Sequence, residues 1–571
     1  MLGFMIGAII LFFILVGAMG SIFKPKEIAI NPNSILRINL SQPIAEKTSG
    51  NFRNLFDFGS GKMKVNLGLN DILANIRRAE TDNNIKGIII VGGISTNTLA
   101  TLDEIRKAII HFKKSGKFVV AYAEGWSQKS YFCASVADKV FMNPTGLFEW
   151  RGLSAQITFY KHLFEKIGVD IQVIYEGKFK TATEPFRLDH MSEQNKQMTM
   201  ELLDSIEHYM VNAVAESRKL SFDEVQSCAH DMLIREAPEA VQRKFVDDLQ
   251  YWDGVASYLR KKTGAKPELL DIDQYDLTPG KLKDVDIDAP KIAVIYAQGD
   301  IIDGEGDDDQ IGSDALSELF RKVRDDDDVK AVVFRINSPG GSANASDVIG
   351  REVKITNSVK PVVVSMGAYA ASGGYYVSAP AAYIFAEPTT LTGSIGVFGM
   401  LPNLQKLLNE KLGLNFDGVK TGKYADLGDI SRPLSEDEKA LIQHNIDLTY
   451  LEFKTVVSDG RKISVDSVEV LAQGRVYTGN RALQLGLVDE IGTVEAAVKK
   501  AASLAKLSTY RTADYPQPDE WFPLLRQLLA DKKESIIRQE LGMEYPTYQS
   551  LRSLMKMNGI QAHMGGVVSV E

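Results

Sequence analysis

Short apolar runs alternate with amphipathic stretches along most of the chain. Runs such as Ile88–Val91 and Val362–Val364 are rich in β-branched residues, whereas Leu316–Val323 places its apolar residues at helical spacing. Continuous apolar strands that are separated by helices are typical of parallel sheets buried on both faces. The pattern therefore predicts an α/β fold.

The body of the chain repeats itself once. Leu67–Pro144 aligns without a gap with Ile311–Pro388, which lies 244 residues later, and the two segments share strand patterns such as KFVVAY and PVVVSM. Farther on, residues 246–261 align with residues 488–503 at a shift of 242. A period of this length indicates two copies of one α/β unit and not a solenoid of short repeats.

An apolar segment precedes the repeats. Leu2–Phe23 is 22 residues long and contains no charge. As a helix it would rise about 33 Å, which is enough to cross a bilayer. The residues around Met19 loosely fit a signal cleavage site, but the length favours an uncleaved anchor. We therefore predict one N-terminal transmembrane helix.

These patterns divide the chain into five regions. Thr278–Pro290, between the copies, has the proline, glycine and charge content of a linker. The tail after residue 510 has no counterpart in the first copy. We predict a transmembrane anchor at residues 1–26, an N-terminal repeat at 45–275 and a linker at 276–290. A C-terminal repeat at 291–508 and a tail at 509–571 follow.

Ser372 lies in the stretch with the strongest chemical signal, Met366–Gly399. It follows a strand-like run, PVVVSM, and precedes Gly373 and Gly374. Two glycines after a strand favour a sharp turn into a helix, here near Tyr375. A serine at such a turn exposes its hydroxyl beside a free backbone N–H, as an acyl-transfer nucleophile requires. Small residues around a serine can equally serve close packing, so this stretch alone does not establish that Ser372 is catalytic.

A second loop could stabilise the negative charge that acyl transfer develops. The buried-strand pattern Ala331–Asn337 ends in the sequence SPGG, Ser338–Gly341. Such a loop can turn a backbone N–H towards an oxyanion. The N–H of Gly373, the residue after the candidate nucleophile, would be one donor. Either Gly340 or Gly341 would be the other.

The order of a strand, SPGG, a spacer and AASGG resembles the Clp protease and crotonase superfamily. TLTGSIGVFG (Thr390–Gly399) and GKFKTATEPFRLDHMS (Gly177–Ser192) are similar to motifs of the signal peptide peptidase A family in its long, two-domain form. The resemblance covers nearly the whole chain. It implies two tandem Clp protease/crotonase-like units with parallel sheets and a catalytic Ser-Lys dyad.

Comparison of the two copies identifies a candidate base. The 7 histidines form no recognisable catalytic triad, whereas a lysine can act as a base if burial lowers its pKa from about 10.4 towards neutrality. At the shift of the repeat, Ser372 corresponds to Gln128, so the first copy lacks the nucleophile. GKFK of the first copy lies over GKYA of the second, so Lys180 corresponds to Ala425. Each copy has lost what the other retains, which predicts one active site assembled across both.

Two further residues belong to the lysine region. Lys178 is the rival base, but the second copy retains Lys423 at its position, which favours a structural or surface role. Ser394 matches the position at which the resemblance implies a hydrogen bond to the lysine amine. The alternative role for Ser394 is that of a turn residue in the TGSIG motif. The candidate catalytic set is thus Ser372 and Lys180, oriented by Ser394.

Composition excludes several classes of function. A chain of 571 residues with 44% hydrophobic and 24% charged residues is an ordinary globular chain of more than one domain. The net charge of −9 gives no support for a nucleic-acid partner. The two cysteines, Cys133 and Cys228, form neither a CxxC motif nor a Cys/His cluster. We therefore expect no metal and no cofactor.

The sequence and the resemblance together imply a membrane-anchored serine endopeptidase. The resemblance implies that it cleaves remnant signal peptides and other apolar, unfolded peptides. It also implies a homo-oligomer, a tetramer whose chamber admits only unfolded chains. Lys24 and Lys26, after the apolar segment, weakly favour a cytoplasmic body by the positive-inside rule. The resemblance implies the opposite, a body outside the bacterial plasma (inner) membrane that faces the periplasm or cell exterior, and we follow it.

Two other functions remain as alternatives. A crotonase-like acyl-CoA enzyme would share the fold and the oxyanion loop, but it would rely on carboxylates and leave Ser372 and Lys180 without a purpose. A catalytically inactive membrane scaffold would have no need of either residue. The serine endopeptidase accounts for both.

Overall fold

The computed structural model describes residues 30–48, 67–278, 286, 288–307, 310–517 and 559–564. The predicted transmembrane segment, Leu2–Phe23, lies outside these residues. Within the described ranges, no helix is both long enough and apolar enough to cross a membrane. The strands of the described residues form three sheets.

The first copy folds around a parallel sheet of six strands. In sheet order they are β6 (Asp248–Leu249), β4 (Lys139–Met142), β3 (Phe118–Ala123), β2 (Ile85–Val91), β1 (Ser34–Asn39) and β7 (Glu268–Asp271). Ile88, Ile89 and Ile90 of β2 are completely buried. One face packs against α3 (Leu69–Thr81), α4 (Leu99–Lys113) and α5 (Gln128–Ala134), and the other against α11 (Trp252–Thr263). Both faces are therefore covered, as the continuous apolar runs predicted.

The second copy has a corresponding sheet of eight strands. These are β17 (Val476–Thr478), β15 (Leu391–Gly393), β13 (Val362–Ala371), β11 (Val329–Ser338), β8 (Lys291–Gln298) and β19 (Arg511–Tyr515), with β14 (Tyr383–Ala386) beside β13 and β18 (Glu490–Ile491) beside β14. All pairs are parallel except β15 with β17. One face packs against α13 (Ser313–Asp325), α14 (Ala343–Val359) and α15 (Gly373–Ser378), and the other against α19 (Val494–Leu504). The predicted α/β fold with parallel sheets is confirmed.

The elements of the two copies recur at nearly constant spacing. β2 and β11 begin 244 residues apart, and so do α3 and α13. The longest of the described helices, α8 (Glu193–Arg218) and α16 (Glu436–Arg461), begin 243 residues apart. Each is capped by a serine: Ser192 accepts a hydrogen bond from the Asn195 N–H and Ser435 from the Glu438 N–H. The other helices that the structure describes are α6 (Lys161–Ile167), the 3₁₀ turn η1 (Thr181–Thr183), α7 (Glu184–Arg187), α9 (Phe222–His230), α10 (Ala237–Gln242) and α12 (Ile272–Asp276) in the first copy, and the π-helical turn η2 (Leu407–Lys411), α17 (Val465–Leu471) and α18 (Gly479–Gln484) in the second.

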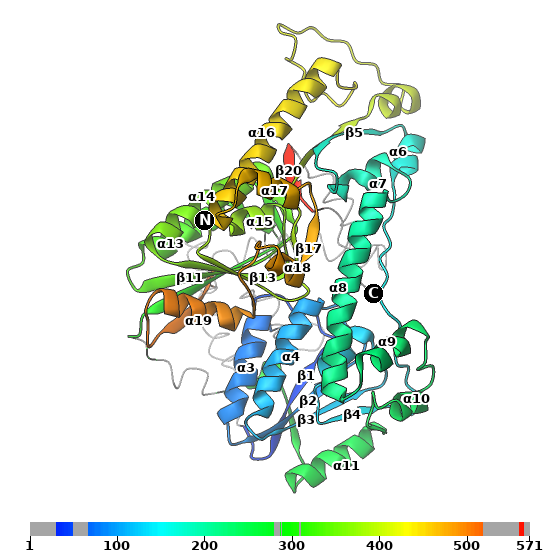
Figure 1. Ribbon diagram of the computed structural model, residues 1–571, viewed down its shortest axis with the longest axis vertical. Helices are drawn as coiled ribbons and strands as arrows, with labels where there is room; N and C mark the ends of the chain where they lie inside the picture. The colour runs from blue at the N-terminus through cyan, green and yellow to red at the C-terminus, as the bar shows by residue number, and fades with distance from the viewer. Residues whose placement is uncertain are drawn as a thin grey trace, which may run out of the picture.

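A third sheet joins the two copies. Its strands, in order, are β10 (Gln310–Gly312), β9 (Asp300–Ile302), β12 (Gly340–Ser342), β20 (Ile560–His563), β16 (Val397–Asn403) and β5 (Asp170–Glu176). β5 belongs to the first copy and pairs antiparallel with β16 of the second along its whole length. Figure 1 shows β5, α6 and α7 beside the upper, second-copy half of the molecule, away from the blue strands of their own copy. The first copy therefore extends an arm onto the second.

A buried ionic cluster forms another contact between the copies. The Arg335 side chain, on β11 of the second copy, lies 2.7 Å from Glu46 and 2.6 Å from Glu104 on α4 of the first. Lys107, also on α4, pairs with Glu387 of the second copy. Burial raises the pKa of the Glu104 and Glu387 carboxyls. Charges that are removed from water in this way depend on their partners across the contact.

Candidate active site

Lys180, Ser372 and Ser394 meet in the interior between the two copies. The Lys180 Nζ lies 2.9 Å from the Ser372 Oγ, and 3.1 Å from both the Oγ and the carbonyl oxygen of Ser394. The three side chains are 2%, 0% and 1% exposed. The structure thus brings into contact three candidates from the sequence, although 192 residues separate Lys180 from Ser372.

Ser372 lies at the turn between β13 and α15. Its backbone is sharply bent, with φ 54° and ψ −114°. Non-glycine residues rarely adopt a positive φ, and such strain is characteristic of functional turns. The Ser372 N–H donates to the Gly393 carbonyl and its own carbonyl accepts from the Tyr376 N–H, each at 2.8 Å. Because that second bond already belongs to a helical turn, α15 begins at Gly373, two residues before the predicted Tyr375.

Lys180 follows β5 after a short turn, and the second copy fixes its backbone. The N–H of Phe179, its neighbour, donates to the Gln473 carbonyl at 2.7 Å. A Cβ at Gly474 would lie 2.6 Å from the Lys180 Cα, and a Cβ at Gly396 would lie 3.2 Å from its Cδ. Glycines at these two positions leave room for the lysine. Neither glycine was predicted as a site residue from the sequence: Gly396 falls within the TGSIG motif, but no signal pointed to Gly474.

Burial lowers the pKa of the Lys180 amine well below its usual value of 10.5. Removal from water is the cause, since it disfavours the charged form, and in the described part of the chain no acidic side chain offsets it. A neutral amine has a lone pair that can accept the Ser372 Oγ–H, while its own N–H groups donate to Ser394. The arrangement can therefore take a proton from the serine hydroxyl.

The candidate oxyanion residues come from two segments that meet next to Ser372. Gly340 and Gly341 belong to β12, and Gly373 is the first residue of α15. A Cβ at Gly340 would lie 2.8 Å from the Gly373 nitrogen, so the two segments approach closely. The Gly340 N–H donates to the Ser338 Oγ at 3.2 Å. Of the two glycines that the sequence left open, Gly340 thus has a hydrogen-bond partner for its N–H within its own loop.

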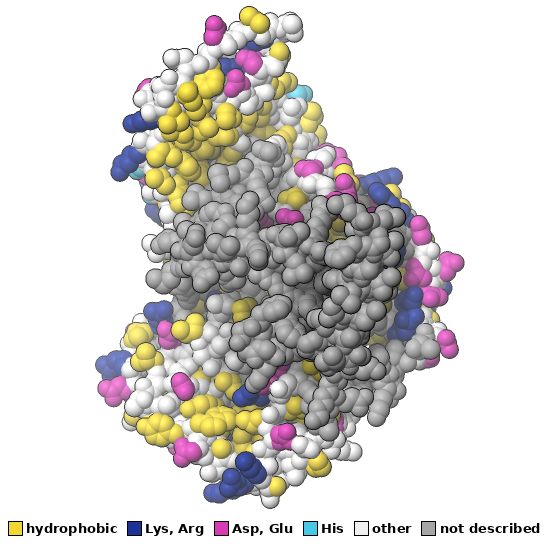
Figure 2. Space-filling model, turned by 180° about the vertical axis from the view of Figure 1, so that it is seen from behind, with side chains coloured by type: hydrophobic (Ala, Val, Ile, Leu, Met, Phe, Trp, Pro, Cys, Tyr) yellow, Lys and Arg dark blue, Asp and Glu magenta, His cyan; other side chains and the backbone are white. Residues whose placement is uncertain are grey.

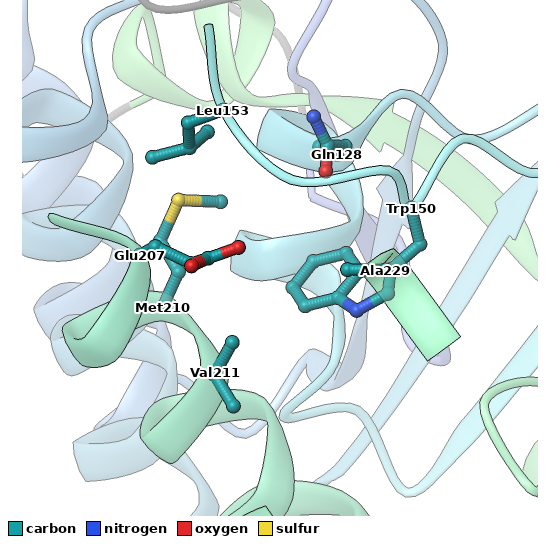
Figure 3. A pocket seen from close by; sticks show the side chains of 7 residues that line it. All are labelled: Gln128, Trp150, Leu153, Glu207, Met210, Val211 and Ala229. Carbon is teal, nitrogen blue, oxygen red and sulfur yellow. The ribbon is translucent and has the colours of Figure 1, made fainter. Parts of the chain in front are cut away.

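In the first copy, Gln128 occupies the position that corresponds to Ser372. Gln128, the counterpart of Ser372, donates its side-chain N–H to the Gly152 carbonyl and accepts the Arg151 N–H at its Oε1, each at 2.9 Å. Trp150 stands at the position of Ser394. Figure 3 shows Gln128 and Trp150 around a small pocket with Glu207 of α8. The first copy has thus replaced the serine of the second by a hydrogen-bonded amide.

Comparisons with known proteins cover both copies. The model of peptidase family S49 matches residues 111–266 and 354–508. The protein named Protease 4 of Haemophilus influenzae is 35% identical over 555 residues, which are 93% of this chain and 89% of that protein. Protease 4 of Salmonella typhi is 36% identical over 528 residues, 89% of this chain and 83% of that protein.

A plant protein extends the same comparison. The protein named Serine protease SPPA, chloroplastic, of Arabidopsis thaliana is 30% identical over 556 residues, 94% of this chain and 78% of that protein. The residues that the family model matches lie in both repeats and include Lys180 and Ser372. From this extent of similarity it follows that the chain belongs to peptidase family S49 and is a serine peptidase.

Proposed function

We propose that this serine peptidase uses Ser372 as its nucleophile and Lys180 as its general base. The observation that supports the proposal is the 2.9 Å contact between the Ser372 Oγ and a buried amine whose pKa is lowered. Ser372 attacks the scissile carbonyl while Lys180 accepts its proton. Lys180 then returns the proton to the leaving amine, and water hydrolyses the acyl-enzyme. Ser394 is a positioning residue, because it accepts hydrogen bonds from the amine at two oxygens.

The oxyanion hole of this mechanism consists of the Gly341 and Gly373 N–H groups. Gly373 follows the nucleophile directly, and its N–H approaches β12. We favour Gly341 over Gly340 as the second donor because the Gly340 N–H is already bonded to Ser338. Two preorganised N–H donors beside a buried nucleophile stabilise the tetrahedral intermediate more strongly than solvent would.

The substrates proposed are remnant signal peptides and other apolar, unfolded peptides. A protein of Enterococcus faecium named Putative signal peptide peptidase SppA is 39% identical over 197 residues, 34% of this chain and 57% of that protein. The complete burial of Ser372 also favours an extended peptide over a folded protein. With Leu2–Phe23 as its anchor, the peptidase would stand on the outer side of the bacterial plasma membrane, and each repeat would be a Clp protease/crotonase-like unit.

We propose that the chain assembles into a ring, a homotetramer, by repeating its internal contact between molecules. The first-copy arm, which contains β5, pairs with β16. Its counterpart in the second copy is residues 412–430, whose apolar side chains are exposed to solvent. The counterpart of β16 in the first copy, residues 153–159, forms no strand. The 412–430 arm carries seven exposed apolar residues: Leu412, Leu414, Phe416, Val419, Tyr424, Leu427 and Ile430. Figure 2 shows hydrophobic side chains gathered on this projecting end of the molecule.

Docking of one chain's 412–430 arm along residues 153–159 of the next would bury these apolar side chains. A head-to-tail contact of this kind closes into a ring when its rotation allows. We expect the double substitution Phe416→Asp and Val419→Asp to convert the oligomer to monomers in light scattering, because charges would enter the apolar contact. Val470→Asp, at another exposed valine, on α17, should leave the oligomer intact. An unchanged mass for the double variant would contradict the proposed interface.

A fluorophosphonate reagent tests the dyad and its pH dependence together. It should label Ser372 at a rate that rises with pH through an apparent pKa well below 10.5, because the base acts only when Lys180 is deprotonated. Below that pKa the protonated amine cannot accept the serine proton, so labelling and peptide hydrolysis should fall together. Mass spectrometry of the labelled peptide identifies the site. A crotonase-like enzyme would not be labelled at Ser372, and a labelling rate that falls at no pH at which the protein stays folded would contradict a lysine base.

A further inference from the structure

The last described segment of the chain, Gly559–Met564, occupies a position beside the catalytic centre. Its strand β20 lies between β12 and β16 and pairs antiparallel with both. Ala562 is opposite Gly341, and Gln561 is opposite Phe398. The pairing continues one residue farther, since the Met564 N–H donates to the Pro339 carbonyl at 2.8 Å. An extended peptide of this chain is therefore held along the oxyanion loop on one side and along β16 on the other.

The carbonyl of Ala562 lies at the proposed oxyanion hole. A Cβ at Gly340 would overlap the Ala562 carbonyl oxygen, and a Cβ at Gly373 would lie 3.0 Å from it. Because Gly341 is the strand partner of Ala562, this oxygen is surrounded by the three glycines that flank Ser372. A carbonyl bound in this place is the one that the nucleophile attacks. The peptide bond in position for attack is therefore the one between Ala562 and His563.

The side chains of the segment are also accommodated. Ala562 is 1% exposed and belongs to the apolar core of the second copy, so only a small side chain fits there. Met564 packs into the core of the first copy, which also includes Ala371. The His563 ring lies 3.2 Å from the Asp300 carboxylate. The segment thus fills a built groove whose walls come from both copies.

We infer that Gly559–Met564 is an intramolecular substrate, bound in the register that allows cleavage after Ala562; the inference rests on the proposed function. The Ser372 Oγ bonds to the Ala562 carbonyl carbon, the bond to the His563 nitrogen breaks, and Lys180 transfers the serine proton to that nitrogen. Water then hydrolyses the ester and leaves a carboxylate at Ala562. Until this step the segment blocks the groove. Afterwards the groove is open to other extended peptides with a small residue at the same position.

The first test measures the intact mass of the full-length protein. The wild type should lose the part of the chain that begins at His563, at a rate independent of protein concentration because the substrate is in the same molecule, whereas Ser372→Ala should keep it. A wild type that hydrolyses casein but keeps its own chain whole would overturn this inference and leave the proposed function standing. A wild type that hydrolyses neither would overturn both.

The second test measures occupancy of the groove without cleavage, in full-length Ser372→Ala protein. The probe is a fluorescent peptide with the sequence of residues 557–566, MNGIQAHMGG. Ser372→Ala protein truncated after residue 558 should bind this peptide at least ~10-fold more tightly than full-length Ser372→Ala protein does. The reason is that in the full chain the tethered segment competes at an effective concentration in the millimolar range. Truncation after residue 564, which keeps β20, is the matched control and should bind like the full chain. The same peptide with Ala562→Trp should not bind, and equal affinity for the two truncated proteins would overturn the inference.

Discussion

Ser372→Ala and Lys180→Ala should each lower kcat/KM for an unstructured peptide by at least ~1,000-fold, since either change removes the proton transfer that activates the nucleophile. The double variant should be no worse than the single ones, because members of one catalytic unit fail together. Lys180→Arg should be equally inactive, since a guanidinium stays protonated and cannot serve as a base. Initial rates of hydrolysis of a fluorogenic peptide measure all four proteins.

Lys178→Ala is the matched control for the lysine change. Lys178 is two residues away in the same turn but is exposed, and its backbone N–H bonds to the Gln473 side chain. Removal of its amine should therefore change kcat/KM by less than about 3-fold. Ser394→Ala should have an intermediate effect and move the pH profile, because Lys180 loses one of its two oxygen partners there. An essential Lys178 beside a dispensable Lys180 would mean that the base has been misassigned.

Arg335→Met should destabilise the protein by about 3–5 kcal/mol, because it leaves buried carboxylates without their cation. Glu46 and Glu104 both lie within ion-pair distance of this guanidinium. The measurement is urea denaturation followed by circular dichroism. Glu104→Gln in the Arg335→Met background should recover part of the loss, since a neutral amide costs less to bury than a carboxylate.

Arg321→Met provides the control, because Arg321 pairs with Glu352 from a half-exposed position on α13. Its loss should cost less than about 1 kcal/mol. The effect of Arg335→Met should also diminish as the pH falls. Burial raises the pKa of Glu104, so the folded protein takes up the proton before the unfolded chain does and gains stability below that folded pKa. Equal losses for the two arginines would mean that the cluster contributes nothing to the contact between the copies.

The internal repeat made much of this fold predictable. A strand such as β2 or β11 is buried on both faces, so its sequence is an uninterrupted apolar run that can be read without knowledge of its neighbours. The comparison of the copies also indicated Lys180, because a base lost at Ala425 and a nucleophile lost at Gln128 are visible as residue identities. These inferences depend on local composition and on alignment, which a sequence contains.

Other parts of the site could not be predicted because they depend on pairing between distant segments. The apolar pattern of β5 does not state that its partner is β16 in the other copy. Gly474 matters only because the Lys180 backbone passes over it. β20 lies beyond the repeat, so no counterpart in the first copy could reveal its position between β12 and β16. In each case the information is a long-range contact and not a local preference.

The antiparallel pair of β5 and β16 has a consequence for how the protein is made. Lys180 leaves the ribosome long before Ser372, but β5 cannot position it until β16, later still in the chain, has been synthesised and has folded. Pairing across so large a sequence separation forms slowly and late, since the entropy of closing the loop must be overcome first. In a nascent chain, Lys180 is therefore present first without its nucleophile, and Ser372 is then present without a base in contact with it. Hydrolytic competence arises only once this long-range pairing has formed, which protects neighbouring unfolded chains at the site of synthesis.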